Sequence, residues 1–202
     1  MNRKLETTFA IKRSKVMRHL KIERVVALLL LLGITGLSSA FVPAANASAL
    51  DNSPTLPAGC ESIQVEEGNG LAFRTYAMGV QVYKWNGTSW TFVAPVATLF
   101  ADARYQGEVG THYVGPTWES NSGSKVVAAR VPGTGCAPDS TAIPWLLLQK
   151  VSTDGAGIFS SVTFVQRLNT TGGTAPTAPG SLVGEVKEVP YTAEYYFYRA
   201  RD

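Results

Sequence analysis

The stretch 80–93 decides the fold, and it reads Val-Gln-Val-Tyr-Lys-Trp-Asn-Gly-Thr-Ser-Trp-Thr-Phe-Val. Asn86-Gly87 accepts the positive φ values that a two-residue type I′ hairpin turn requires. That turn predicts a register in which Trp85 faces Thr88, Tyr83 faces Trp90 and Gln81 faces Phe92. Because side chains alternate along a strand, four aromatic residues then share one face: Tyr83, Trp85, Trp90 and Phe92. The sequence therefore predicts an antiparallel hairpin with one aromatic face.

The rest of the domain repeats the same pattern of short β-branched and aromatic runs between Gly, Pro, Asn and Ser. Such runs indicate strands, and many short strands in one domain indicate a sandwich or a barrel. We predict further strands at 71–77, 111–114, 125–131, 145–148, 158–168 and 191–199, a short helix or irregular strand at 98–105, and a mobile loop or lid at 170–180. We expect one all-β domain over 58–202, folded as a β-sandwich, with a closed β-barrel as the alternative.

Residues 1–49 are typical of a signal peptide. Basic residues dominate the start, an almost unbroken apolar run covers 25–37, and Ala45-Asn46-Ala47 supplies a small-residue cleavage pattern. The apolar run is shorter than the roughly 20 residues that span a bilayer, although an uncleaved anchor is the alternative. We expect cleavage after Ala47 or Ala49, from a start at Met1 or Met17. The mature protein would be secreted or periplasmic with no stable membrane span, and 50–57 would be a flexible lead-in.

Removing this leader reverses the charge of the chain. The leader holds eight of the 18 Lys and Arg residues and two of the 15 Asp and Glu residues, so the remainder carries a net charge of −3. Nucleic-acid binding depends on neutralising many phosphates, and binding to anionic lipid needs basic residues as well. We therefore expect no nucleic-acid partner and no electrostatic attachment to a membrane.

Cys60 and Cys136 are the two cysteines of the chain. In an exported protein, two cysteines most simply form one disulfide. Free buried thiols and a metal pair are the alternatives, but zinc commonly takes four ligands and His112 is the one histidine after the leader. We predict a Cys60–Cys136 disulfide and no metal site.

Motifs for cofactor chemistry are missing from the sequence. Gly133-Thr134-Gly135 resembles the start of a dinucleotide fingerprint but runs into Pro138 without a strand-turn-helix setting. The sequence also has no G-x-S-x-G nucleophile elbow, P-loop, H-E-x-x-H or EF-hand pattern. We expect no cofactor.

The stretch 110–119 carries the residues best suited to acid–base chemistry. His112 and Glu119 could act as base and acid if the fold brings them within about 3 Å, directly or through one water. Tyr113 and Trp118 could line the same depression. The structural alternative is a hydrogen-bonded histidine near a strand end, with Trp118 in the core and Glu119 in solvent. Side chains on opposite sides of a sheet would end the catalytic hypothesis.

Two further groups are candidates for ligand binding. The hairpin aromatics Tyr83, Trp85, Trp90 and Phe92 could stack on a sugar or another flat small molecule, although aromatic stripes are more often core. Arg167 with Asn169 could hold a carboxylate, and the alternative is a structural pair between Arg167 and a nearby Asp or Glu.

Several segments together resemble an uncharacterised family of exported bacterial and fungal proteins, domain of unknown function 3455. The matching segments are 79–83, 94–99, 112–119, 143–148, 163–173 and 189–198. The resemblance covers nearly the whole predicted domain, and it implies no established activity and no catalytic residues.

Three hypotheses for function follow. The leading one is a binding or envelope-associated module with an aromatic-lined surface, for an unknown small molecule or glycan. The second is a small cofactor-independent hydrolase or isomerase centred on His112 and Glu119. The third is a structural surface protein without a small ligand. The sequence leaves the oligomeric state open.

Overall fold

The computed structural model of the chain describes residues 53–201. The predicted signal peptide and the first residues of the predicted lead-in lie outside this part. No helix among the described residues is long and apolar enough to span a bilayer.

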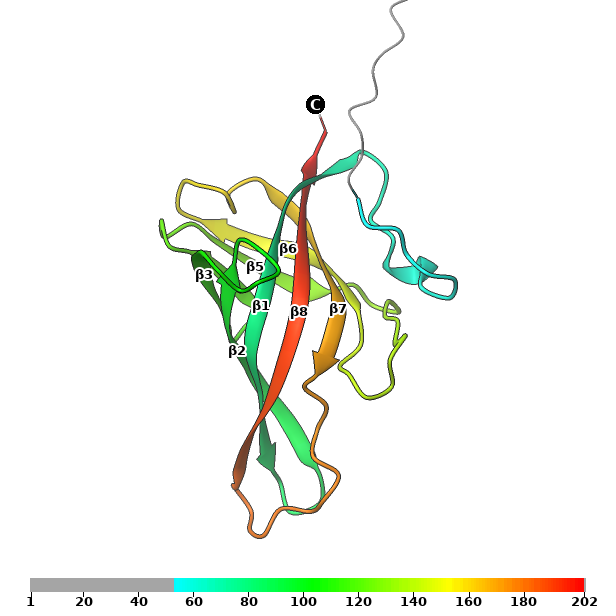
Figure 1. The fold of residues 1–202 in the computed structure, drawn as a ribbon, viewed down its shortest axis with the longest axis vertical. Coiled ribbons are helices and arrows are strands. Elements are labelled where there is room, and N and C mark those ends of the chain that lie inside the picture. The colour runs from blue at the N-terminus through cyan, green and yellow to red at the C-terminus, as the bar shows by residue number, and fades with distance from the viewer. Residues whose placement is uncertain (1–52, 202) are drawn as a thin grey trace, which may run out of the picture. The chain divides into compact units, whose positions relative to one another are not determined.

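Eight antiparallel strands form a closed barrel in which each strand pairs with its neighbours in sequence (Figure 1). The strands are β1 (Asn69–Trp85), β2 (Trp90–Phe100), β3 (Glu108–Tyr113), β4 (Thr117–Ser120), β5 (Lys125–Arg130), β6 (Leu146–Asp154), β7 (Val162–Gly172) and β8 (Val186–Ala200), preceded by a 3-10 turn, η1 (Glu61–Ile63). The all-β class is confirmed. Of the two predicted architectures the chain forms the closed barrel, and the preference for a sandwich was wrong.

Closure comes from the pairing of the two longest strands. β8 pairs with β1 from Asn69 opposite Ala200 to Lys84 opposite Val186, so the last strand joins the first and closes the barrel. A sandwich and a barrel both bury one face of each strand, so the alternation of side chains is the same in the two folds. The pairing partner of the last strand is a long-range property that this alternation does not contain.

Most predicted strands are present, with different bounds. The segments predicted at 71–77 and 80–85 are one continuous strand, β1, and residues 170–172 belong to β7 rather than to a loop. The segment at 98–105 is the end of β2 followed by a turn, and no helix forms there. The four-residue strand β4 was not predicted, because its run of Thr-Trp-Glu-Ser lies directly behind Gly115-Pro116 and is too short to show an alternating pattern.

The predicted hairpin forms, but its register differs by two residues. Trp85 pairs with Trp90 and Tyr83 pairs with Phe92, with a bulge between Val82 and Tyr83. The reason is the Asn86 side chain, whose Oδ1 accepts hydrogen bonds from the backbone N–H groups of Thr88 and Ser89 and so builds a wider turn. The shift by an even number keeps all four aromatic residues on one face, as predicted.

Beyond the barrel, three strands continue as a ribbon made of residues 80–85, 90–96 and 186–190. β7 stops pairing with β8 at Tyr191, and β3 stops pairing with β2 at Ala97, whereas β1 stays paired with both neighbours. The ribbon lies at the lower end of the view in Figure 1. The loop 173–185 connects β7 to β8 at this end.

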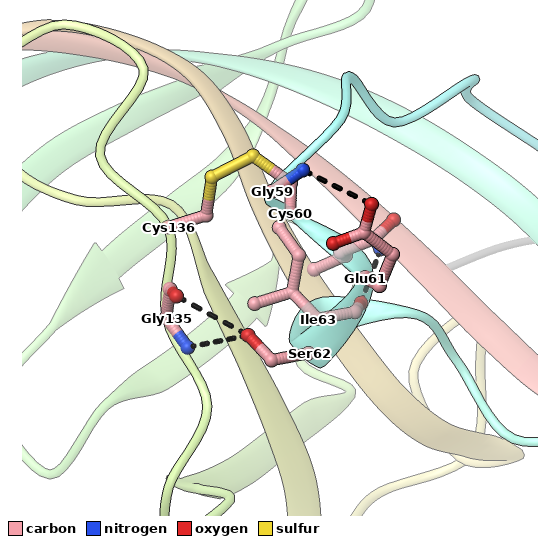
Figure 2. The surroundings of a disulfide bond; sticks show 8 residues. Gly59, Cys60, Glu61, Ser62, Ile63, Gly135 and Cys136 are labelled. Carbon is pink, nitrogen blue, oxygen red and sulfur yellow. Dashed lines mark hydrogen bonds between the residues drawn. A yellow bond between two sulfur atoms is a disulfide. The ribbon is translucent and has the colours of Figure 1, made fainter.

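A second apolar cluster lies on the outer surface of β6, β7 and β8, beneath residues 53–68. Ile63 and Val65 of this N-terminal segment pack there with side chains of the strands, namely Leu147, Phe164, Leu168, Tyr196 and Tyr198. The disulfide Cys60–Cys136 ties the segment to the β5–β6 connection, and Ser62 Oγ donates a hydrogen bond to the Gly135 carbonyl (Figure 2). The predicted disulfide is confirmed, and its partners are 76 residues apart in sequence.

Candidate functional site in the barrel interior

The barrel interior combines large aromatic side chains with small residues that make room for them. Trp118, Tyr195 and Phe197 belong to the interior cluster, together with Ala77, Ala97 and Ala193. Gly79 is another small inward position, and a Cβ there would collide with the Val96 carbonyl oxygen. Small residues in β1 and β2 therefore set the space that the aromatic residues of β4 and β8 occupy.

His112 lies within this interior. Its ring stacks on Trp118 at a centroid distance of 4.3 Å and meets Tyr195 edge to face at 5.0 Å. Nδ1 lies 2.8 Å from the carbonyl oxygen of Thr117, which can only accept, so Nδ1 carries the proton and Nε2 is the acceptor in the neutral ring. Burial lowers the pKa of His112 to about 3, far more than the Thr117 hydrogen bond raises it. The imidazole is therefore neutral at physiological pH.

Three tyrosines and one arginine form the polar end of the interior. The hydroxyl of Tyr83 donates to the Gly173 carbonyl at 2.7 Å, and the hydroxyls of Tyr191 and Tyr195 lie 3.4 Å apart. Burial raises the pKa of all three phenols, and the positive charge of Arg167 acts in the opposite direction on each. The same charge also lowers the pKa of His112, so Arg167 acts on the whole polar group.

Three buried polar atoms in this region have no hydrogen-bond partner among the described residues: Thr75 Oγ1, Gln81 Nε2 and Trp118 Nε1. Thr75 is paired with Tyr195 in the barrel register and so shares its inward face. Gln81 borders the same cluster, because a Cβ added at Gly173 would contact both Gln81 and Tyr191. Unpaired buried polar atoms cost about 1–3 kcal/mol each, so three in this region mark it as a candidate binding site.

The structure does not bring His112 and Glu119 together. His112 pairs with Trp118, so the next residue, Glu119, projects from the opposite face of the sheet. There its carboxylate accepts a 2.7 Å hydrogen bond from the Tyr113 hydroxyl and lies 3.4 Å from Lys125 Nζ. The hydrogen bond raises the pKa of Tyr113. Of the four residues predicted at this depression, His112 and Trp118 lie inside the barrel and Tyr113 and Glu119 lie outside.

The hairpin aromatics divide in a similar way. Tyr83 is buried on the ribbon next to the barrel, where its hydroxyl donates to the Gly173 carbonyl, whereas Trp85 and Trp90 lie farther along the ribbon, where the chain's own loop contacts them. Trp90 Nε1 donates to the Ala178 carbonyl at 2.8 Å, and a Cβ at Gly180 would lie 2.5 Å from the Trp85 ring. Phe92 remains 53% exposed. Loop 173–185 therefore covers much of the aromatic surface that was predicted to bind a ligand.

Arg167 and Asn169 are also separated. Asn169 is exposed with a φ of 49° at a bulge in β7. Arg167 is paired with Leu146 and Tyr195, both members of the interior group, so it is an inward position. The predicted alternative, a pair with Asp or Glu, does not form among the described residues, whose four ion pairs do not include Arg167.

Other parts of the described structure offer less chemistry. Within residues 53–201, no group of three or more His, Cys, Asp or Glu side chains could hold a metal ion. A surface pocket of about 430 Å³ lies outside the barrel, beside the turn that enters β1, and it is bordered by Glu66, Glu67, Tyr198 and Arg201 among others.

Comparison with known proteins places the chain in a family. Residues 66–199 match the family model described as "Protein of unknown function (DUF3455)", and because this is most of the chain, the protein belongs to that family. No curated protein and no solved structure matches the chain. The chain thus belongs to this family and folds as an all-β closed barrel, and neither finding gives an activity.

Sequence reasoning missed Thr75 and Gln81 as members of the interior site, and it considered Tyr191 and Tyr195 only as additional aromatic residues for stacking on a ligand. Part of the signal was present, since residues 81 and 83 share a face by alternation, as do 191 and 195. What the sequence lacked was the closure of β8 on β1, which brings these two pairs into one interior.

Proposed function

We propose that this protein is a small-molecule-binding module whose ligand enters the barrel interior beside Trp118. Eight-stranded barrels have interiors that side chains can fill or that can hold one small ligand. The observation that carries the proposal is the set of three unpartnered buried polar atoms, Thr75 Oγ1 and Trp118 Nε1 in the barrel and Gln81 Nε2 on the ribbon beside Tyr191. A ligand with hydrogen-bonding groups would satisfy them.

The surrounding side chains favour a ligand with a flat or apolar body. Trp118 and Tyr195 present aromatic surfaces, and binding sites of this kind are mainly apolar with a few placed polar groups. The interior is a better candidate than the ribbon aromatics, because loop 173–185 already contacts Trp85 and Trp90. The proposal thus keeps a binding function and moves its site from the predicted hairpin surface into the barrel.

Export from the cytosol is part of this proposal. The Cys60–Cys136 disulfide supports it, because disulfides persist in oxidising compartments such as the periplasm or the extracellular medium. Intact mass measurement of protein from the culture medium and the periplasm tests it. A mature chain that starts at Ser48 or Leu50, two hydrogens lighter than its reduced form, is expected, and a full-length intracellular chain with alkylatable thiols would contradict it.

Indole N–H resonances provide the test of binding, because Trp118 Nε1 is one of the unpartnered atoms. The protein is titrated with benzoate, phenylacetate, benzamide and phenylacetamide, and the four indole signals are assigned by single Trp→Phe variants. We expect a saturable shift of the Trp118 signal with at least one probe, and a weaker response in Gln81→Leu. The Trp145 signal serves as the control, because Trp145 packs against the outer cluster.

Two results would overturn the proposal. If none of the four probes moves the Trp118 signal, or if only Trp85 and Trp90 respond, the interior is not the binding site. A long-lived water on Trp118 Nε1, detected by water–protein NOE and not displaced by any probe, would show that hydration satisfies these atoms instead.

A further inference from the structure

Arg167 occupies an inward position of β7, its charge acts on the interior groups, and its side chain is only partly buried. Its register partners are Leu146 on β6 and Tyr195 on β8. Its charge acts on Tyr83, His112, Tyr191 and Tyr195. The guanidinium thus lies between the polar interior and the end of the barrel.

This charge has no counter-ion among the described residues. Nε and Nη2 donate to the Pro144 carbonyl at 3.1 and 2.7 Å, which is a neutral acceptor. A hydrogen bond from the guanidinium to the Tyr195 hydroxyl also opposes the burial that raises the pKa of this phenol, so fewer than five N–H groups are left for a ligand. Arg74 and Arg104, in contrast, each lie within ion-pair distance of a carboxylate. The position therefore retains both an uncompensated positive charge and N–H groups for a further acceptor.

The balance of hydrogen-bonding groups points in the same direction. Gln81 Nε2 and Trp118 Nε1 are both donors without an acceptor, and the guanidinium is also purely a donor. The Tyr191 and Tyr195 hydroxyls can donate as well. His112 Nε2 and Thr75 Oγ1 can accept. A complementary ligand therefore needs acceptors chiefly for the Gln81 and Trp118 N–H groups. Because the Arg167 charge acts in partly dehydrated surroundings, the ligand should also carry one negative charge.

Building on the proposed function, we infer that the ligand is a small monocarboxylate whose carboxylate pairs with Arg167 while its body extends toward Trp118. A planar carboxylate matches the fork of a guanidinium, so the pair can form two parallel hydrogen bonds. A doubly charged phosphate fits less well, since a single cation faces the interior.

Matched acids and amides test this inference on the intact protein. Benzoate and phenylacetate are compared with benzamide and phenylacetamide, which have nearly the same shape but no charge. Dissociation constants come from the Trp118 signal in the unaltered protein, in Arg167→Gln and in Arg167→Lys. We expect the acids to bind at least tenfold more tightly than the amides, the preference to vanish in Arg167→Gln, and Arg167→Lys to be intermediate because it keeps the charge but loses the fork.

Arg130→Gln is the matched control. Arg130 also donates through Nε and Nη2 to a loop carbonyl, that of Thr134, but its charge does not act on the interior tyrosines. We expect this variant to keep the full preference for acids. If Arg130→Gln removes it as well, the effect comes from loop anchoring and the inference fails.

The failures of the two proposals are distinguishable. If amides shift the Trp118 signal as strongly as acids, the barrel binds small molecules but the ligand is not a carboxylate. If neither class shifts it, both proposals fall. Should Arg167→Gln not fold, the acid–amide comparison in the unaltered protein still decides the inference.

Discussion

The outer face of β7 and the inner face of β1 bury glutamine side chains in opposite ways. On the outer face, Gln166 is fully satisfied: its Nε2 donates to the Ile63 carbonyl at 2.7 Å and its Oε1 accepts from the Tyr198 hydroxyl at 2.8 Å. On the inner side, Gln81 is equally buried, at 2% exposure, but its Nε2 has no partner among residues 53–201. The outer face is completed by the chain itself, and the inner face is not.

This difference indicates that the two faces of the sheet have different roles. The outer cluster is closed by the N-terminal segment and the Cys60–Cys136 disulfide, so its groups serve stability. The inner cluster contains unpaired polar atoms, which lower the free energy of unfolding. Such a loss of stability is expected at a binding site, where a ligand supplies the missing hydrogen bonds. Each of the following experiments tests this difference between the outer and the inner cluster.

Removing the disulfide should have the largest effect. In a Cys60→Ser, Cys136→Ser double variant, the unfolded chain regains the entropy of a loop of 76 residues, which predicts a loss of about 4 kcal/mol in the free energy of unfolding. Urea denaturation measures the loss. Below the unfolding transition, the Trp118 indole signal should be unchanged, because the disulfide lies outside the barrel. A change in that signal would mean that the two faces are coupled.

The two buried glutamines form a matched pair for the second experiment. Gln166→Met removes two hydrogen bonds in the outer cluster and should destabilise the protein by about 2–3 kcal/mol. Gln81→Met removes an unpartnered donor and should be neutral or stabilising by up to about 1 kcal/mol. Denaturation midpoints of both variants measure this difference. Equal losses would show that Gln81 has a partner in solution and that the contrast is wrong.

Stability should fall as the pH drops below 6.5, because of His112. The folded protein keeps His112 neutral down to a pKa of about 3, whereas the unfolded chain takes up the proton near 6.5. The unfolded state thus binds more protons in this window, and about 2 kcal/mol should be lost between pH 7 and pH 5. Denaturation at several pH values measures the slope.

His112→Gln is the control for this pH effect. No other histidine follows the predicted leader, so the variant should flatten the profile between pH 5 and pH 7, whatever its absolute stability. The lowered pKa values of Asp102 and Asp139 contribute only at still lower pH. A slope that persists in His112→Gln would contradict a neutral, buried imidazole.

The smallest effect is expected at Glu119. Its partners Tyr113 and Lys125 lie on the outer surface, and the Glu119 and Lys125 side chains are about one-third exposed, at 31% and 36%. Glu119→Gln should therefore change the free energy of unfolding by less than about 1 kcal/mol and leave probe binding at Trp118 unaltered. Urea denaturation together with the benzoate titration measures both. Loss of binding in this variant would revive a functional link between Glu119 and the interior.

The sequence allowed the local features to be predicted. Val80–Val93 indicated a hairpin with one aromatic face, because turn preferences and side-chain alternation are properties of short segments. The two cysteines indicated their disulfide, because a short N-terminal segment predicted export. The register failed by two residues because the Asn86 side chain builds a wider turn than the type I′ pair implies. The pairing of His112 with Glu119 failed for a simpler reason, since Trp118 rather than Glu119 lies opposite His112.

By itself, the sequence determined that this chain is all-β, belongs to its family and joins Cys60 to Cys136. Only the tertiary structure decided that the strands close into a barrel, that Trp118 and Arg167 are inward positions of it, and that Gln81 borders the same group of residues at Tyr191. The physical reason is that alternation defines which side chains share a face of one strand, whereas the pairing of β8 with β1, in which Arg74 lies opposite Tyr196 at a separation of 122 residues, defines which faces meet.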